Sequence, residues 1–306
     1  MTFSCNVIKT SKTLKLKLYK YLDPERIDIL SNGLIRFTQP ALFNDPFEMS
    51  PYISAIASEE EIDEIFDAKH VSQLREEYEK MNRESRRAVK FEEFKKRYPK
   101  EILLPRIKES AKGKALDHAK ESLSIAMSQA IGILCLTGKP DNLLMWAHYA
   151  ASHTGMVIEF DVEHPFFKQE FNEPLSPTGL DEDLSKDYGY LKPMIYSETR
   201  PEITISSVKS FDSFLVKSNE WKYEAEWRML MPTARANATK NINGVDVFLY
   251  AVPKSAIIKV ILGCRASDKL LELVKTIKNT DKDLGHLQIE KMVLDKKSFG
   301  LISYVV

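Results

Sequence analysis

Two glutamates separated by one residue are the strongest candidates for chemistry in this chain. Glu224 and Glu226 lie in the segment WKYEAEWR, residues 221–228. Side chains two apart on a β-strand project to the same side, so a strand here would bring both carboxylates together. Aromatic neighbours such as Trp227 make that position costly for a charge that has no partner. Neighbouring carboxylates also push each other's pKa values apart, which is typical of an active site.

The same residues also fit a structural role. Glu224 and Arg228 are four residues apart on the expected strand and could form an ion pair. The nearby tryptophans would then simply pack in the core. Both interpretations remain open at this point.

Further polar and aromatic residues interrupt apolar segments elsewhere. They occur at the end of an expected first strand, in a turn, at the end of a central strand and on a helix. The candidates for ligand contact are Tyr19, Lys20, Tyr21, Asn44, Thr137, Trp146, His148, Tyr149 and Arg228. Each also has a simpler explanation: aromatic residues at helical spacing usually pack, His148 could be a hydrogen-bonded histidine, and the turn at Asn44 could bond its own backbone.

Several familiar sites are absent from the sequence. It contains no Gly-rich phosphate loop, no dinucleotide glycine fingerprint and no Gly-x-Ser-x-Gly elbow. Of the six histidines only His148 and His153 are close, and the three cysteines are far apart, so we expect neither a metal site nor a disulfide framework.

Bulk composition indicates a soluble protein. The 306 residues carry 44 basic and 44 acidic side chains, so no net charge attracts nucleic acid or an anionic membrane. No apolar run is long enough to span a bilayer, and the first residues lack the charged segment and long apolar run of a signal peptide, so we expect none. We therefore expect a cytoplasmic protein that has no membrane partner; its oligomeric state is not determined by these features.

Hydrophobic periodicity predicts strands and helices without regular alternation, which favours an α+β fold. Strands are expected at residues 14–21, 34–38, 132–137, 154–161, 194–196, around Glu226, and at 245–252, 257–262, 287–294 and 301–306. Helices are expected at 24–32, 142–150, 208–218 and 268–277.

We expect one domain over residues 1–306, with a charged helical insertion or lid at 58–130 and a C-terminal α/β extension at 266–306. The insertion is rich in Lys, Arg and Glu. Its basic cluster at Arg83, Arg86, Arg87 and Lys90 could face nucleic acid, but mixed charges favour a solvated surface.

Four ordered motifs resemble a bacterial family known only as a domain of unknown function. They are LYKY at 18–21, FNDPFE at 43–48, MWAHY with the strand that follows at 145–161, and WKYEAEWR at 221–228. They span most of the chain outside the insertion and the tail. The family description assigns no reaction.

The order of elements also resembles the ADP-ribosyltransferase fold, particularly its DNA-modifying toxin branch. That resemblance implies mixed sheets, NAD as substrate, Glu226 as the acid beneath the ribose, and Glu224 as the group that orients or deprotonates an acceptor. It implies that Tyr21 or Tyr149 stacks on nicotinamide and that Lys20 or Arg228 contacts the diphosphate or the adenosine ribose. The middle motif could be Thr137, Trp146 or Tyr149. Lys20 departs from the resembled pattern, which has His or Arg there, and lysine lacks the planar fork of arginine.

Three functions follow as hypotheses. The first is an NAD-dependent mono-ADP-ribosyltransferase or NAD glycohydrolase that acts as a toxin or antiviral effector on a protein or nucleic acid acceptor. The second is a non-catalytic binding or regulatory module. The third is a metal-dependent nuclease that uses Asp45, Glu48, Glu224 and Glu226 as oxygen ligands.

Overall fold

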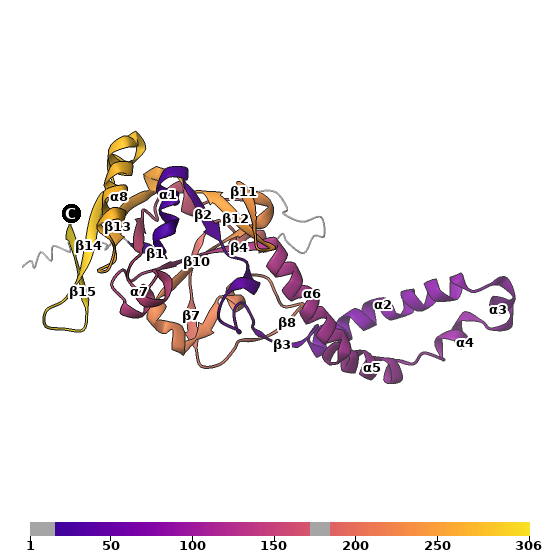
Figure 1. Cartoon of the computed structure of the whole chain (residues 1–306). Coiled ribbons are helices and arrows are strands. Elements are labelled where there is room, and N and C mark those ends of the chain that lie inside the picture. Colours follow the sequence, from indigo (N-terminus) through magenta and orange to yellow (C-terminus); the bar gives the residue numbers. More distant parts are fainter. Residues whose placement is uncertain (1–15, 172–183) are drawn as a thin grey trace, which may run out of the picture.

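The computed structural model describes residues 16–171 and 184–306. It has the α+β architecture expected from the sequence, built around a mixed sheet of eight strands (Figure 1). The first two residues of the strand expected at 14–21, and part of the irregular segment after residue 162, lie outside the described residues.

The main sheet is antiparallel except where β13 runs parallel to β14. Its strands in spatial order are β15 (Leu301–Val305), β14 (Gln288–Leu294), β13 (Ile257–Leu262), β5 (Met156–Phe160), β1 (Leu18–Leu22), β4 (Ile131–Thr137), β10 (Glu226–Pro232) and β6 (Leu191–Pro193). The C-terminal strands therefore extend the main sheet.

A three-stranded sheet packs its apolar residues against the main sheet. It consists of β11 (Ala238–Ile242), β12 (Val245–Ala251) and β2 (Leu34–Phe37). Phe37 on β2 and Tyr250 on β12 are buried, with ring centroids 4.3 Å apart. The largest apolar core contains residues from both sheets and from α8 (Asp268–Thr280), whose Leu270 and Val274 are buried. Burial of this kind is the main favourable contribution to folding.

Two small parallel pairs complete the strands. They are β3 (Tyr52–Ala55) with β8 (Glu202–Thr204), and β7 (Ile195–Ser197) with β9 (Val216–Ser218). Two short helices lie beside the main sheet, α1 (Asp28–Asn32) and α7 (Leu143–Tyr149). Gly33 ends α1 with a φ of 66°, the left-handed conformation that glycine adopts at little cost.

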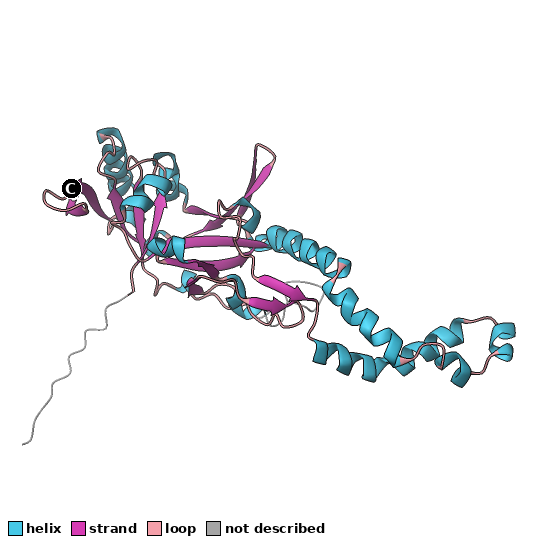
Figure 2. Ribbon diagram, turned by 90° about the horizontal axis from the view of Figure 1, so that it is seen from below, coloured by secondary structure: helices cyan, strands magenta, loops and turns pink. Residues whose placement is uncertain are grey.

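Five helices form an arm that projects away from the sheets, as Figures 1 and 2 show. They are α2 (Glu59–Lys80), α3 (Arg83–Ala88), α4 (Phe91–Lys95), α5 (Lys100–Lys112) and α6 (Lys114–Ala130). Ser58 and Glu61 form a capping box that fixes the start of α2. The arm matches the charged helical segment expected at 58–130, and α6 continues directly into β4.

One expected helix is wrong. Residues 208–218 form a 3-10 turn, Asp212–Phe214, followed by β9. Phe211, Phe214 and Leu215 have helical spacing, but all three are buried in one apolar cluster. The Asp187 carboxylate accepts a hydrogen bond from the Phe211 backbone N–H at 2.6 Å, so tertiary contacts satisfy this turn. No helix within residues 16–171 and 184–306 is long and apolar enough to cross a membrane.

Candidate functional site

A cleft of about 590 Å³ opens where β1, β4 and β10 meet α7 and the turn before β10. All but two of the sequence-predicted site residues line it. Those that line it are Tyr19, Lys20, Tyr21, Asn44, Thr137, His148, Tyr149, Glu224 and Glu226. The remaining two, Trp146 and Arg228, are fully buried behind its wall.

Strand register brings three of these residues into one row. Tyr19 on β1 pairs with Thr137 on β4, and Thr137 pairs with Glu226 on β10. Paired residues on neighbouring strands project to the same face at about 5 Å. Three segments that are remote from one another in the sequence therefore meet at the floor of the cleft.

Glu224 and Glu226 converge by a different route from the one expected. Glu224 ends a 3-10 turn (Asn219–Glu224), Ala225 adopts a left-handed conformation with φ 43°, and Glu226 begins β10. The two carboxylates do not alternate along one strand. The turn and the Ala225 conformation aim both of them into the cleft, where they are 3% and 6% exposed.

Lys217 joins the two acids. Its ammonium nitrogen lies 2.7 Å from Glu224 Oε2 and 3.3 Å from Glu226 Oε2, and it sits 4.5 Å from the centre of the Trp221 ring. Burial alone would lower the pKa of Lys217, but the Glu226 and Glu224 carboxylates outweigh burial and raise it. Lys217 is therefore charged at neutral pH and neutralises part of the acidic pair.

Arg228 holds Glu226 from below the cleft. Its Nε and Nη2 donate to Glu226 Oε1 and Oε2 at 2.8 and 3.0 Å, while Nη2 also donates to Glu48 Oε2 at 2.9 Å. Burial opposes ionisation of Glu226, but Arg228 and Lys217 together lower its pKa from 4.5 to about 2. Arg228 thus pairs with Glu226 and Glu48, whereas the structural alternative from the sequence paired it with Glu224.

The Glu224 carboxylate has fewer charged partners than the Glu226 carboxylate. Its Oε1 accepts a hydrogen bond from the Tyr149 hydroxyl at 2.7 Å, and the Thr137 hydroxyl donates to its backbone carbonyl. Tyr149 also hydrogen-bonds the Asn44 side chain. Burial, followed by the contact with Glu224, raises the pKa of Tyr149, so this hydroxyl remains a donor at neutral pH. Glu224 is thus oriented by neutral groups and Lys217, without an arginine.

Trp146 supports the cleft from behind. Its Nε1 donates to the Pro140 carbonyl at 2.8 Å, and its ring meets Tyr21 edge-on with centroids 5.2 Å apart. Tyr21 in turn donates to the Lys139 carbonyl at 2.9 Å. Trp146 therefore fixes Tyr21, which lines the cleft, while Met145, His148 and Tyr149 present the other face of α7 to it.

Sequence reasoning missed two cations of the cleft, Lys217 and Arg36. Arg36 lies between buried Ile35 and Phe37 on β2, and this alternation was the available signal that its side chain faces away from the core. Its Nε is buried, and no group among the described residues accepts a hydrogen bond from it. Burial, together with nearby Arg26, lowers the pKa of Arg36.

Lys20 lies on the same side of the cleft as a second cation. It donates to the Cys135 carbonyl at 3.0 Å, and burial lowers its pKa. Neither Lys20 nor Arg36 has a carboxylate within ion-pair distance in the described part of the chain. The cleft therefore combines a neutralised pair of carboxylates with two cations that lack an ion-pair partner among the described residues.

The four acids of the nuclease hypothesis do not form an open cation site. Arg228 binds Glu48 and Glu226, and Lys217 binds Glu224 and Glu226. Within residues 16–171 and 184–306, no three His, Cys, Asp or Glu side chains are grouped so that they could hold a metal ion.

Residues 145–229 match the family described as "Protein of unknown function (DUF2971)", and this stretch runs from within α7 into β10. No curated protein and no solved structure matches the chain. The matched stretch carries Tyr149, Lys217, Glu224 and Glu226, so the part of the chain that is similar to this family supplies these four lining residues of the cleft.

Proposed function

We propose that this cleft binds NAD and that the protein cleaves the bond between nicotinamide and ribose, with transfer of ADP-ribose to a macromolecule or to water. The observation that carries this proposal is one cleft that is lined by two buried carboxylates, by aromatic rings, and by Lys20 and Arg36, which form no ion pair among the described residues. NAD combines a cationic aromatic ring, a ribose and an anionic diphosphate. The aromatic rings complement the nicotinamide ring, the carboxylates complement its positive charge and the ribose hydroxyls, and the cations complement the diphosphate.

The chemistry requires negative charge near the reacting sugar. Breaking the C–N bond leaves electron deficiency on the ribose, as in glycoside hydrolysis, and the bonding electrons leave with neutral nicotinamide. A carboxylate that accepts a hydrogen bond from a ribose hydroxyl stabilises this state. The acceptor then forms the new bond to the ribose carbon and gives up a proton.

Hydrogen bonding favours Glu224 for the contact with the sugar. Both Glu226 oxygens are already bound by Arg228, and one also binds Lys217. Glu224 also lines the cleft, and its two oxygens bind only Tyr149 and Lys217 among the described residues. In this proposal Glu224 contacts the ribose, the role that the family resemblance implied for Glu226. Glu226 instead positions Lys217 and adds negative charge near the reacting sugar.

The stacking partner of nicotinamide would be Tyr149 or Tyr21, because both rings line the cleft near Glu224. Lys20 and Arg36 would contact the diphosphate. The role as a bacterial toxin or antiviral effector rests on the resemblance to DNA-modifying toxins.

A non-catalytic binding module is the second candidate. It is favoured by the complete pairing of Glu226, Arg228 and Lys217 without any ligand. Such a module would bind a phosphorylated ligand at Lys20 and Arg36 and leave it intact.

The test combines binding with turnover. Purified protein is mixed with NAD, nicotinamide is quantified by chromatography, and the melting shift is measured at saturating NAD. We expect nicotinamide release that falls at least about a hundredfold in Glu224→Gln, the usual loss for one stabilising group. Arg36→Ala should weaken NAD binding while turnover of bound NAD persists, and Glu220→Gln, an exposed acid of the same 3-10 turn, serves as the control.

Each outcome separates the candidates. A melting shift without nicotinamide release supports the binding module, because a ligand that binds only the native state must stabilise it. If NAD causes no melting shift and no nicotinamide is released, NAD is rejected as the ligand. Undiminished release in Glu224→Gln rejects the role given to that carboxylate.

A further inference from the structure

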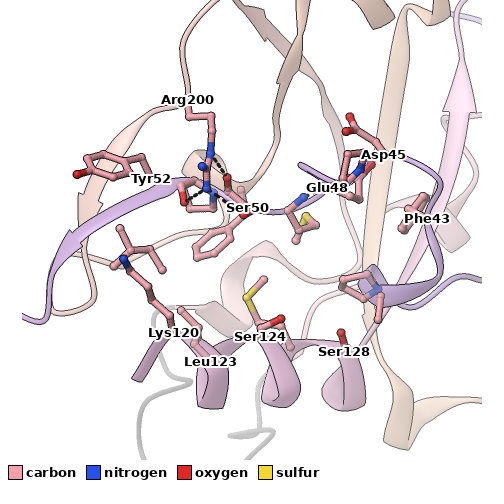
Figure 3. Close-up of a pocket in the computed structure, with 18 of the residues that line it drawn as sticks. Phe43, Asp45, Glu48, Ser50, Tyr52, Lys120, Leu123, Ser124, Ser128 and Arg200 are labelled. Carbon is pink, nitrogen blue, oxygen red and sulfur yellow. Dashed lines mark hydrogen bonds between the residues drawn. The ribbon is translucent and has the colours of Figure 1, made fainter. Parts of the chain in front are cut away.

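A second cavity of about 650 Å³ lies beside the candidate cleft, and the proposed function does not use it (Figure 3). One wall is the segment that carries Asp45, Glu48 and Met49. The other is the stretch of α6 from Lys120 to Ser128. Phe43 lines both cavities. The volume of the second cavity lies in the range of about 300–1,000 Å³ that is usual for small-molecule sites.

The middle of this cavity is apolar and adaptable. Met49, Met127 and Phe214 are buried residues that line it, and Leu123 on α6 lies beside them. Methionine side chains are unbranched and polarizable, so they adjust to ligands of different shape. This part can accept an aliphatic or aromatic body.

One end of the cavity is cationic. In Figure 3, Lys120 rises from α6 toward Ser50 and Tyr52, and Arg200 descends toward the same place. Arg200 donates from Nε to the Ser50 carbonyl and from Nη2 to the Pro51 carbonyl, both at 2.8 Å, which holds its guanidinium at the rim. Among the described residues, no carboxylate forms an ion pair with Lys120 or Arg200.

The opposite end is acidic. Asp45 lies there with Phe43 in Figure 3 and is 6% exposed. Its Oδ1 accepts a hydrogen bond from the Phe47 backbone N–H at 2.9 Å, but no cation pairs with it in the described ranges. Glu48 also lines this end but is neutralised by Arg228, and Glu121 on α6 is solvent-exposed. Asp45 is thus the carboxylate left to attract a ligand cation.

We propose that this second cavity binds a small dipolar ligand of amino-acid or short-peptide chemistry. Its carboxylate lies toward Lys120 and Arg200, its ammonium or guanidinium group lies toward Asp45, and its apolar body lies against Met49 and Met127. Opposite charges at the two ends of one apolar cavity fit a ligand that carries both signs, and charge-assisted hydrogen bonds at each end fix its direction. This inference does not depend on NAD cleavage in the neighbouring cleft.

The probe is the dipeptide arginyl-phenylalanine, compared with its C-terminal amide by isothermal titration calorimetry on the full chain without NAD. The amide keeps both positive groups and the ring but lacks the carboxylate. Wild-type protein should bind the acid about tenfold more tightly than the amide, the difference expected for one charge-assisted hydrogen bond. In Lys120→Ala this preference should shrink to about twofold or less, with Arg200 still present.

Two further variants sharpen the result. Asp45→Asn, which keeps an oxygen for the Phe47 N–H, should weaken binding of both dipeptides about equally, whereas Lys114→Ala, an exposed position on α6 outside the cavity, should change neither. The proposal is overturned by the absence of saturable binding at millimolar dipeptide, by equal affinity for acid and amide in the wild type, or by a preference that survives in Lys120→Ala. Circular dichroism of each variant shows whether it is folded.

Discussion

The Glu226→Gln substitution tests whether the ion pairs beneath the cleft stabilise the fold. Glutamine keeps the size of the side chain but removes the charge that Arg228 and Lys217 share. The folded-state pKa of Glu226 is about 2, against 4.5 for an ordinary glutamate. At 1.36 kcal/mol per pKa unit, this difference corresponds to a stabilisation of about 3 kcal/mol. Loss of one member of a buried ion pair costs a similar amount, about 3–5 kcal/mol.

The sign of the pH dependence follows from the lowered pKa. The unfolded chain binds the Glu226 proton more tightly than the folded chain does, so the stabilisation is complete above pH 4.5 and is lost as the pH falls toward about 2. We therefore expect Glu226→Gln to be about 3 kcal/mol less stable than wild type at pH 7, and the difference to shrink between pH 4.5 and the acid limit of folding.

Urea unfolding followed by tryptophan fluorescence, repeated between pH 7 and pH 3, measures this difference. All three tryptophans, Trp146, Trp221 and Trp227, lie close to the site, so the signal reports on it. Glu220→Gln is the matched control, since its carboxylate is exposed, and it should change stability by less than about 0.5 kcal/mol. A Glu226→Gln protein as stable as wild type at pH 7, or a deficit that stays constant down to pH 3, would refute the reasoning.

Three further predictions concern the hydrogen bonding, packing and modularity of the fold. Tyr149→Phe removes the donor to Glu224 while the ring stays. The free energy of unfolding should fall by about 1 kcal/mol, and any nicotinamide release should fall about fivefold or more. Unchanged values in both assays contradict the role given to this hydroxyl. Gly263→Ala places a Cβ 2.0 Å from the His153 carbonyl oxygen and should lower the free energy of unfolding in urea by about 3 kcal/mol. Gly285→Ala, whose nearest atom is 3.6 Å away, should change that free energy by less than about 1 kcal/mol. Equal effects would show that the backbone relaxes freely at residue 263. Replacing residues 83–96 at the tip of the arm by a short Gly/Ser linker should leave the melting midpoint seen by tryptophan fluorescence within about 2 °C of wild type. The reason is that all three tryptophans and the main core lie outside the arm. A larger drop would show that the tip supports the sheets.

Much of the secondary structure could be predicted from local pattern. Residues 257–262 form a strand within the expected limits, because a run of apolar β-branched residues ends at a glycine. The charged segment after Ser58 forms helices, since acidic residues begin α2 and a capping box fixes its start. Local propensity and tertiary structure agree in these segments.

The segment 208–218 shows where local pattern fails. Its apolar spacing is helical, but burial against Tyr188 and the bond from Asp187 to Phe211 stabilise a turn and a strand instead. Both partners are at least 20 residues distant in sequence, so no local window contains them. The strands β3 and β8 were missed for the same reason, because they are short and pair with each other from distant parts of the sequence. The strand β11 was also missed, although its partner β12 follows it directly across Asn243 and Gly244.

The residue types of the candidate site were determined by the sequence, since Glu224, Glu226 and Tyr149 were recognisable as polar groups within apolar segments. Tertiary structure alone decided how their charges are divided. The left-handed conformation of Ala225 directs both acids into one cleft. Arg228 forms an ion pair with Glu226, and Lys217 bridges Glu224 and Glu226. Side-chain type sets which interactions are possible, but electrostatic energy depends on distance and burial, which arise only when strands remote in the sequence are packed together.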